Sequence, residues 1–224
     1  MMLIPVISLS ALSELIFPSR CLGCRQLGIG ICSTCRASWH PHIYRSSIST
    51  VNYSFPVYSA VAYSPVAQKV LLGAKEGALH DADRLILQAL THSLAYFYSE
   101  VGIADLVPIP SRKMNTRKRG RDFILEQTYE VSRAPIVRVR AILTHSRKVK
   151  DQTTLNSRSR EINLSQSMRC ANREESSNIP VIIIDDLVTS GATLREAGRA
   201  LHGAGYSVIG AVTACVAKPL RYTQ

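Results

Sequence analysis

Residues 181–193 read VIIIDDLVTSGAT, and this stretch decides the predicted fold. Its four consecutive branched apolar residues are typical of a strand buried on both faces, as in a parallel sheet. Two acids end the strand, and a short loop of small residues around Gly191 follows. Leu194, Ala197 and Leu201 then recur at helical spacing, so a helix is expected directly after the loop. The stretch therefore predicts the strand–loop–helix unit of an α/β fold.

The loop at residues 189–193 has the composition of an anion-binding turn. A loop between a strand and a helix directs backbone N–H groups at a phosphate, and the helix dipole favours the negative charge. Asp185 and Asp186 lie one step earlier, where they can accept hydrogen bonds from the vicinal hydroxyls of a sugar. This order of residues favours a sugar phosphate as ligand. The alternative is an ordinary turn with two solvated acids, whereas a Walker A loop is excluded because its Gly-Lys-Ser/Thr is absent.

The overall charge favours a polyanionic partner. The 224 residues include 27 Lys and Arg against 16 Asp and Glu, which gives a formal net charge of +11. Nucleic acid fits this charge, and so does a small substrate that carries a phosphate and a pyrophosphate. Charge alone leaves both classes of partner open.

Residues 1–17 are apolar, yet they have neither the positive flank of a secretory signal nor the length of a spanning helix. Leu9, Leu12 and Leu15 recur at helical spacing, which favours an amphipathic helix packed on its own protein. Attachment to a membrane surface is the alternative. We therefore expect a cytoplasmic protein without a membrane span.

Four cysteines form two C-x-x-C pairs, Cys21 with Cys24 and Cys32 with Cys35, separated by seven residues. Two such turns can supply the four thiolates of a closed, tetrahedral structural zinc site. Disulfides or redox-active cysteines are the alternative, which a reducing compartment disfavours. We expect this module to be a small appendage in residues 1–50, with a polar linker at 39–52 and the α/β domain in residues 51–224.

The remaining pattern predicts alternating helices and strands. Strands are expected at 57–63, as an antiparallel or edge strand, and at 105–110, 136–143 and 207–216. Helices are expected at 68–77, 81–100 and 122–132, the second of them capped by Asp81. Cys215 lies in an apolar run and is expected in the core.

Two basic segments interrupt this pattern. Residues 111–121 hold six Lys and Arg and directly follow a strand end, which is where parallel sheets bind anions. Residues 144–167 are polar and have no clear period, so a mobile flap that closes over a substrate is the functional interpretation. Solvated or disordered charge runs are the alternative for both segments.

These separated features together resemble one family. Residues 181–193 resemble the phosphoribosyl-pyrophosphate (PRPP) signature of the type I phosphoribosyltransferases, with an apolar strand, two acids and Thr-Ser-Gly-x-Thr. With the four cysteines, the chain resembles the ComF family, competence-type proteins in which a zinc-binding module precedes a phosphoribosyltransferase domain. The other matching residues are Phe17-Pro18, Lys75, the VPIP at 107–110, Arg119-Gly120, Gln152, Leu155, Arg160 and Asn163.

The resemblance implies a type I phosphoribosyltransferase-like fold, with a Rossmann-like parallel sheet, and transfer of the phosphoribosyl group of PRPP with pyrophosphate leaving. It implies that Asp185 and Asp186 hold the ribose hydroxyls, and that the 5′-phosphate binds at Thr189, Ser190, Gly191, Ala192 and Thr193. Mg²⁺ would bridge the pyrophosphate. The candidates to neutralise the pyrophosphate are Arg112, Lys113, Arg119 and Lys75, with Gln152 and Arg160 acting from the flap.

Two departures from the family pattern limit these implications. Arg121-Asp122-Phe123 stands where the family usually has Phe-Asn-Gln, which weakens Arg121 and Asp122 as substrate ligands. Thr189 stands where related hypoxanthine-type enzymes carry an aspartate, which argues against purine salvage. The alternative function is a non-catalytic one, either PRPP sensing or the binding of single-stranded DNA with DNA-uptake proteins.

Overall fold

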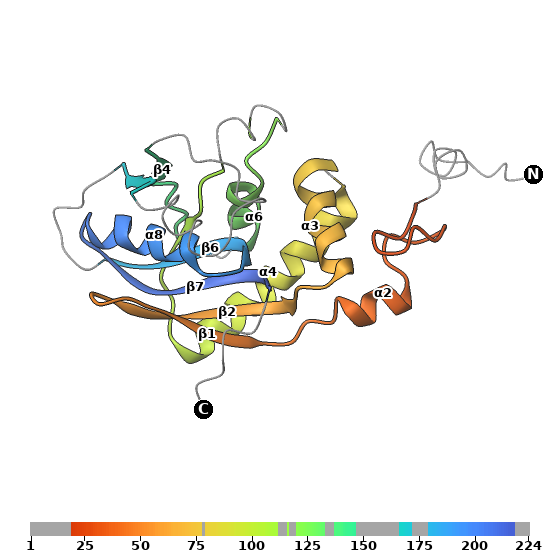
Figure 1. The fold of residues 1–224 in the computed structure, drawn as a ribbon, viewed down its shortest axis with the longest axis horizontal. Coiled ribbons are helices and arrows are strands. Elements are labelled where there is room, and N and C mark those ends of the chain that lie inside the picture. Colours follow the sequence, from red (N-terminus) through yellow and green to blue (C-terminus); the bar gives the residue numbers. More distant parts are fainter. Residues whose placement is uncertain are drawn as a thin grey trace, which may run out of the picture.

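A five-stranded sheet forms the centre of the protein (Figure 1). The computed structural model describes residues 19–77, 79–111, 116, 120–132, 137–146, 166–171 and 179–217. The strand order is β1-β2-β7-β6-β3, where β2, β7, β6 and β3 run parallel and β1 joins the edge antiparallel. The strands are β1 (Tyr44–Ser49), β2 (Ser54–Ala62), β3 (Asp105–Pro108), β6 (Ile179–Val188) and β7 (Tyr206–Val216). This is the mostly parallel α/β sheet that the sequence predicts.

Strand β6 lies inside the sheet and contributes to the core on both of its faces. Ile182 and Ile184 belong to one hydrophobic cluster, while Val181 and Ile183 belong to a second cluster on the opposite face. Successive side chains of a strand point to opposite faces, so an uninterrupted apolar run is required where both faces are covered. The prediction of a strand buried on both faces is confirmed.

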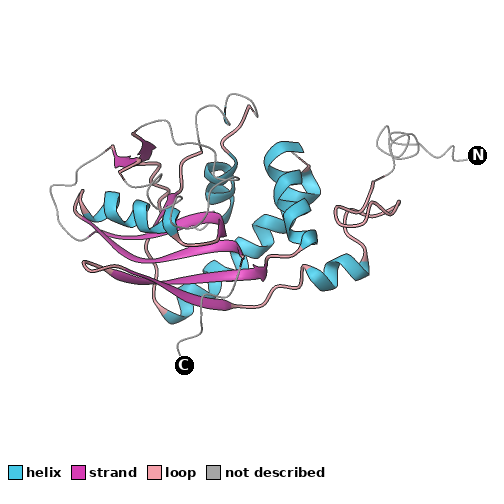
Figure 2. Cartoon of the chain, viewed as in Figure 1, coloured by secondary structure: helices cyan, strands magenta, loops and turns pink. Residues whose placement is uncertain are grey.

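Helices cover the two faces of the sheet (Figure 2). One face carries α4 (His80–Glu100) and α6 (Phe123–Val131), and α3 (Pro65–Gly77) packs against α4. The other face carries α8 (Ala192–His202) and a small hairpin of β4 (Leu143–His145) and β5 (Met168–Cys170). The short helix α2 (Ser33–Ser38) precedes β1. Cys215 is buried in the first of these faces, as predicted.

The structure corrects four local predictions. The polar linker expected at 39–52 is wrong, because residues 44–49 form β1 and only Ile48 of this strand is buried. Of the two alternatives for the strand at 57–63, the antiparallel one is confirmed, because β2 pairs antiparallel with β1. The edge alternative is wrong, because β2 also pairs with β7 on its other side. Asp81 does not cap α4, which begins at His80 without a side-chain cap. Instead of the strand at 136–143, Val139 makes one parallel bridge to β3 and β4 begins at Leu143.

The four-cysteine module shares a hydrophobic cluster with the helices of the α/β domain. Cys21, Leu22, Ile31, Cys35 and Trp39 are buried in the same cluster as the inner faces of α3 and α4. The sequence predicts an appendage because its cysteine spacing is local, while these packing partners lie far along the chain. The division into residues 1–50 and 51–224 remains a prediction.

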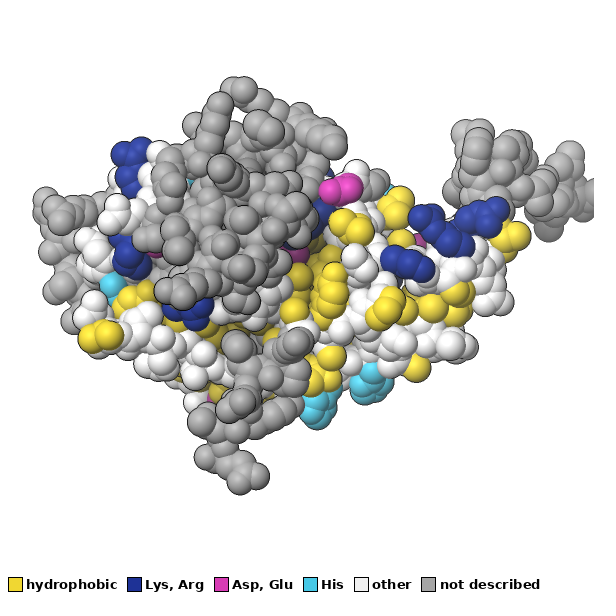
Figure 3. Space-filling view, viewed as in Figure 1, with side chains coloured by type: hydrophobic (Ala, Val, Ile, Leu, Met, Phe, Trp, Pro, Cys, Tyr) yellow, Lys and Arg dark blue, Asp and Glu magenta, His cyan; other side chains and the backbone are white. Residues whose placement is uncertain are grey.

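Basic side chains gather at the end of the molecule that carries the cysteines (Figure 3). Arg20, Arg25 and Arg36 are exposed in this region. Within the described ranges, none of the helices combines the length and the apolar character needed to cross a membrane.

Candidate functional site

The loop between β6 and α8 has the geometry of an anion-binding turn. Strand β6 ends at Val188, and α8 begins at Ala192 with no side chain capping its first turn. The N–H groups of that turn are therefore available to a ligand, and the helix dipole favours an anion there. The Arg195 guanidinium donates to the Ser190 carbonyl at 2.9 Å, which fixes the loop from the side of the helix. Ala192 is buried, whereas Thr189 is exposed and Thr193 is half-buried.

Gly191 is required in this loop for two independent reasons. Its φ of 74° lies in the left-handed region, which residues with a Cβ atom rarely adopt. In addition, a Cβ at this position would lie 2.5 Å from Cδ1 of Ile48 in β1. Edge strand β1, which the sequence analysis missed, therefore packs directly under the anion-binding turn.

We expect Gly191→Ala to lower the free energy of unfolding by more than the roughly 1–3 kcal/mol of backbone strain alone. Gly120→Ala is a matched control, because Gly120 has a φ of 73° but no described atom within 4 Å of its Cβ position. Urea titration of both variants separates strain from the steric clash with Ile48. Equal losses in the two variants would show that β1 does not constrain the loop.

Asp185 and Asp186 lie at the carboxyl end of β6 and are buried, with 7% and 4% of their surfaces exposed. The Lys75 ammonium at the end of α3 lies 2.5 Å from Oδ2 of Asp186. The Asp186 backbone N–H donates to Oδ1 of Asp185 at 2.9 Å. The structure thus brings Lys75 and the two acids together, although they are more than a hundred residues apart in the chain.

The two carboxyl groups differ in their affinity for protons. Burial and the neighbouring Asp186 carboxylate raise the pKa of Asp185 well above its ordinary value of 3.8. Burial also raises the pKa of Asp186, but the Lys75 ammonium and hydrogen bonds from Asp185 and Lys75 outweigh it and hold this pKa below its ordinary value. Asp185 therefore binds a proton more readily than Asp186 does, and negative charge is favoured on Asp186 beside Lys75.

The ends of the first basic segment lie next to the acids. The Ile109 N–H donates to the Ile184 carbonyl at 2.9 Å, so the chain leaves β3 beside the end of β6. The Ser111 hydroxyl donates to Asp122 at 2.7 Å, which joins the two ends of the segment. Arg112, Lys113 and Arg119 lie outside the described residues, and their contact with a ligand remains a prediction.

Arg121 and Asp122 make structural contacts. The Arg121 guanidinium lies 2.7 Å from Asp83 of α4 and 2.7 Å from Glu126 of α6. Asp122 accepts the hydrogen bond from Ser111. These contacts tie the end of the basic segment to two helices.

The β4–β5 hairpin is clamped to α8 by side chains that the sequence analysis missed. Glu196 accepts a hydrogen bond from the Met168 N–H at 2.9 Å, and Arg199 donates to the Met168 carbonyl at 2.8 Å. On the opposite side, His145 lies 3.0 Å from the Pro110 carbonyl. The sequence analysis missed these residues because an i, i+3 Glu–Arg pair on a helix usually indicates an exposed surface.

This clamp positions the start and end of the second basic segment close to the anion-binding helix. Residues 147–165, with Gln152 and Arg160, lie outside the described residues. The predicted roles of these two side chains therefore remain predictions.

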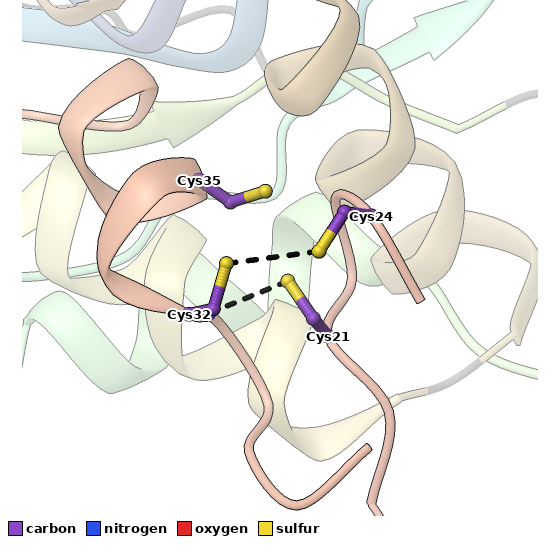
Figure 4. Close-up of side chains that lie close together, drawn as sticks. All are labelled: Cys21, Cys24, Cys32 and Cys35. Carbon is purple, nitrogen blue, oxygen red and sulfur yellow. Dashed lines mark hydrogen bonds between the residues drawn. The ribbon is translucent and has the colours of Figure 1, made fainter. Parts of the chain in front are cut away.

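The four cysteines of the predicted zinc site converge on a common point (Figure 4). All four Sγ atoms lie within 4.8 Å of one another, with 3.7 Å between Cys24 and Cys32. A zinc–sulfur bond is about 2.3 Å long, so a tetrahedron of sulfurs around zinc has edges of roughly 3.8 Å. The cysteines are free rather than disulfide-bonded. This donor set fits a single zinc ion, and the sulfurs are too close together to surround a multi-iron cluster.

The environment of Cys21 stabilises a thiolate. Burial raises the pKa of Cys21, but hydrogen bonds from the backbone N–H groups of Cys24, Cys32 and Gly23 outweigh it and lower the pKa to about 6. The Cys32 N–H lies 3.3 Å from the Cys21 sulfur. Burial and the neighbouring sulfurs raise the pKa of Cys35 to about 12. Without a metal, a thiolate at one cysteine opposes the ionisation of the neighbouring thiols. A divalent cation would neutralise this negative charge.

The region that carries the loop is similar to a known domain family. Residues 124–223 match the phosphoribosyl transferase domain family. The match begins in α6 and includes β6, the acid pair, the loop, α8 and β7. The phosphoribosyl transferase domain match therefore contains Asp185, Asp186 and Gly191, whereas Lys75 and the cysteines lie before it.

Two solved structures are similar to this chain at low sequence identity. One is an adenine phosphoribosyltransferase, with 13% identity and a TM-score of 0.43 over 82% of this chain and 89% of that chain. The other is an adenine phosphoribosyl transferase from Trypanosoma brucei in complex with AMP, pyrophosphate and ribose-5-phosphate, with 12% identity and a TM-score of 0.40 over 83% and 94% of the two chains. No curated protein matches.

Proposed function

We propose that this protein binds PRPP together with Mg²⁺ at the β6–α8 loop and transfers the phosphoribosyl group to an acceptor. The observation that carries the proposal is the buried acid pair of β6, which directly precedes an uncapped helix N-terminus in a segment that matches the phosphoribosyl transferase domain. The 5′-phosphate would bind the N–H groups of residues 189–193. The basic segments would surround the pyrophosphate.

The different proton affinities of the two acids suit the recognition of two vicinal hydroxyls. The carboxylate of Asp186 can only accept hydrogen bonds, whereas Asp185, when it holds a proton, can also donate one. A ribose diol, in which each hydroxyl both donates and accepts, therefore finds complementary partners. Since the transition state of phosphoribosyl transfer resembles an oxocarbenium ion, the negative charge on Asp186 would also stabilise it. Lys75 would keep that charge in place before the substrate arrives.

Magnesium would be held mainly by the substrate. Among the described residues, only the four cysteines form a group of three or more His, Cys, Asp or Glu close enough to share an ion. Mg²⁺ prefers phosphate oxygens and keeps several waters, so it can enter with the pyrophosphate of PRPP. When bound, it would neutralise the leaving pyrophosphate.

A calorimetric titration with Mg-PRPP tests the proposal. We expect Asp185→Asn/Asp186→Asn to weaken PRPP binding at least tenfold, because hydrogen bonds that involve a charged group contribute about 1.5–3 kcal/mol. Asp105→Asn is a matched control, because Asp105 pairs with Arg140 at 2.6 Å at the opposite, amino end of the parallel strands. Unchanged affinity in the double variant would contradict the proposal, because the acids and the loop would then form an ordinary strand–helix turn that does not bind PRPP. Release of pyrophosphate in the presence of bases or DNA then identifies the acceptor.

A second candidate function is a non-catalytic one, in which the protein senses PRPP or binds single-stranded DNA as part of a ComF-type DNA-uptake machinery. The exposed Arg20, Arg25 and Arg36 around the cysteines favour a polyanionic partner at that end. DNA binding that persists in the Asp185→Asn/Asp186→Asn variant, without any release of pyrophosphate from PRPP, would support this function over transfer.

A further inference from the structure

Helix α3 contacts the four-cysteine module through its first half. The Lys69 ammonium donates to the Gly23 carbonyl at 2.5 Å, and Gly23 lies inside the first C-x-x-C turn. Val66 lies against the same turn, since a Cβ on Gly23 would be 3.3 Å from its Cγ2. Leu22 lies beside Gly73, since a Cβ at Gly73 would be 3.6 Å from Cδ2 of Leu22, an ordinary van der Waals distance. The metal-binding turn and α3 are therefore in direct polar and apolar contact.

The same helix reaches the acid pair through its last turn. Lys75 lies six residues after Lys69, which corresponds to roughly 9 Å along a helix axis. Its ammonium group is 2.5 Å from Asp186. Between these two lysines, Val70, Leu71 and Ala74 are buried in the cluster that also contains Cys21 and Cys35. These packed residues form a continuous path along which a shift of α3 at Lys69 would be passed on to Lys75.

We propose that the four-cysteine centre is a positioning element of the acid-pair site. A metal ion on the cysteines would fix the turn at Gly23, the turn holds α3 through Lys69, and α3 holds Lys75 on Asp186. Metal occupancy thus sets the affinity of a site to which the cysteines themselves contribute no ligand. The inference rests on the proposed PRPP site for its ligand but not for its structural test.

Thermodynamic linkage gives the proposal a quantitative form. If metal binding orders α3 and PRPP binding requires that order, each ligand must raise the affinity of the other by the same factor. Couplings of this kind are typically fivefold or more. We therefore expect PRPP affinity to fall about five- to tenfold when the connection between the cysteine turn and α3 is broken.

The sharpest variant is Lys69→Met in the full-length, zinc-loaded protein, because it breaks the link to Gly23 while keeping all four cysteines. We expect this change to weaken Mg-PRPP binding about five- to tenfold. The conservative replacement Lys69→Arg, which keeps a charged donor at this position, should keep the wild-type affinity. Arg84→Met removes one exposed positive charge from α4 near the module and is the control for electrostatic attraction. It should leave the affinity unchanged.

A double-mutant cycle with Lys75→Met decides whether the effect passes through Lys75. In the Lys75→Met background, Lys69→Met should cause no further loss of PRPP affinity. If Lys69→Met lowers PRPP affinity equally with and without Lys75, the proposed path is wrong. It is also wrong if Arg84→Met lowers PRPP affinity as much as Lys69→Met does.

Amide hydrogen exchange tests the coupling without PRPP. Removal of zinc, or Lys69→Met, should accelerate exchange in residues 70–76 of α3 relative to β7. If the wild-type protein does not bind PRPP at all, the proposed function fails, but this measurement still applies. Unchanged exchange in α3 would then overturn the link between the cysteine centre and Lys75.

Discussion

Replacing Asp186 by Asn is expected to lower the free energy of unfolding at neutral pH by about 1.5–3 kcal/mol, the usual contribution of a hydrogen bond to a charged group. The change deprives Lys75 of the carboxylate that lies 2.5 Å from its ammonium. The same replacement at Asp185 is expected to raise the free energy of unfolding. The reason is that burial and the Asp186 charge oppose ionisation of Asp185, and a neutral amide has no proton to lose.

The two effects should depend on pH in opposite senses. The raised pKa of Asp185 means that its proton stabilises the folded state fully below the ordinary value of 3.8, and that this contribution is lost as pH rises through the folded pKa. The lowered pKa of Asp186 means that its contribution is present above the ordinary value and is lost as pH falls through the folded pKa. The advantage of Asp185→Asn should therefore grow with pH, and the deficit of Asp186→Asn should vanish in acid.

Urea titrations at several pH values measure both variants, with Asp105→Asn as a control away from the loop. Stability changes of the same sign in the two variants at neutral pH would contradict the assigned division of charge. The more stable Asp185→Asn protein should nevertheless bind PRPP more weakly, because its amide cannot become a carboxylate, which accepts hydrogen bonds at both oxygens. Such opposition between stability and binding is common where buried charge serves a ligand.

Loss of the metal from the cysteine centre is expected to cause the largest destabilisation. Cys35→Ser would remove one of the four candidate zinc ligands from a site that shares its buried cluster with α3, α4 and Trp39. Zinc binding contributes on the order of 10 kcal/mol in small zinc modules, so several kcal/mol should be lost here. The loss should spread into the main core, because the module is packed into it.

Trp39 provides the measurement, because it is the single tryptophan and only 1% of its surface is exposed. Its side chain is buried in the same cluster as Cys21 and Cys35, and its backbone N–H donates to the Cys35 carbonyl at 3.1 Å, so its fluorescence reports on the module. Cys170→Ser is the control, since Cys170 lies in β5 and outside the cluster of four sulfurs. Purified protein without zinc, or a Cys35→Ser protein as stable as the control, would refute a structural metal.

Much of the site was predictable from short stretches of sequence. The apolar run before Asp185 required a strand covered on both faces, and Gly191 marked the turn to a helix, because both properties depend on neighbouring residues in the chain. The C-x-x-C spacing likewise predicted the convergence of the sulfurs. The mostly parallel sheet followed from the alternation of such strands with helices.

Only the tertiary structure decided how these parts meet. Polar residues 44–49 gave no strand signal, yet β1 packs Ile48 under Gly191 because the edge of the sheet buries just one face of that strand. The partners of Asp186 and Gly23 are Lys75 and Lys69 of α3. The sequence resemblance names Lys75 for the pyrophosphate, but no sequence period indicates which group either lysine contacts. The charge on the acid pair was also not predictable, because it depends on burial and on an ammonium brought in by folding. The sequence by itself thus determined the local chemistry of the loop and the cysteines, and the packing of α3 between them determined their connection.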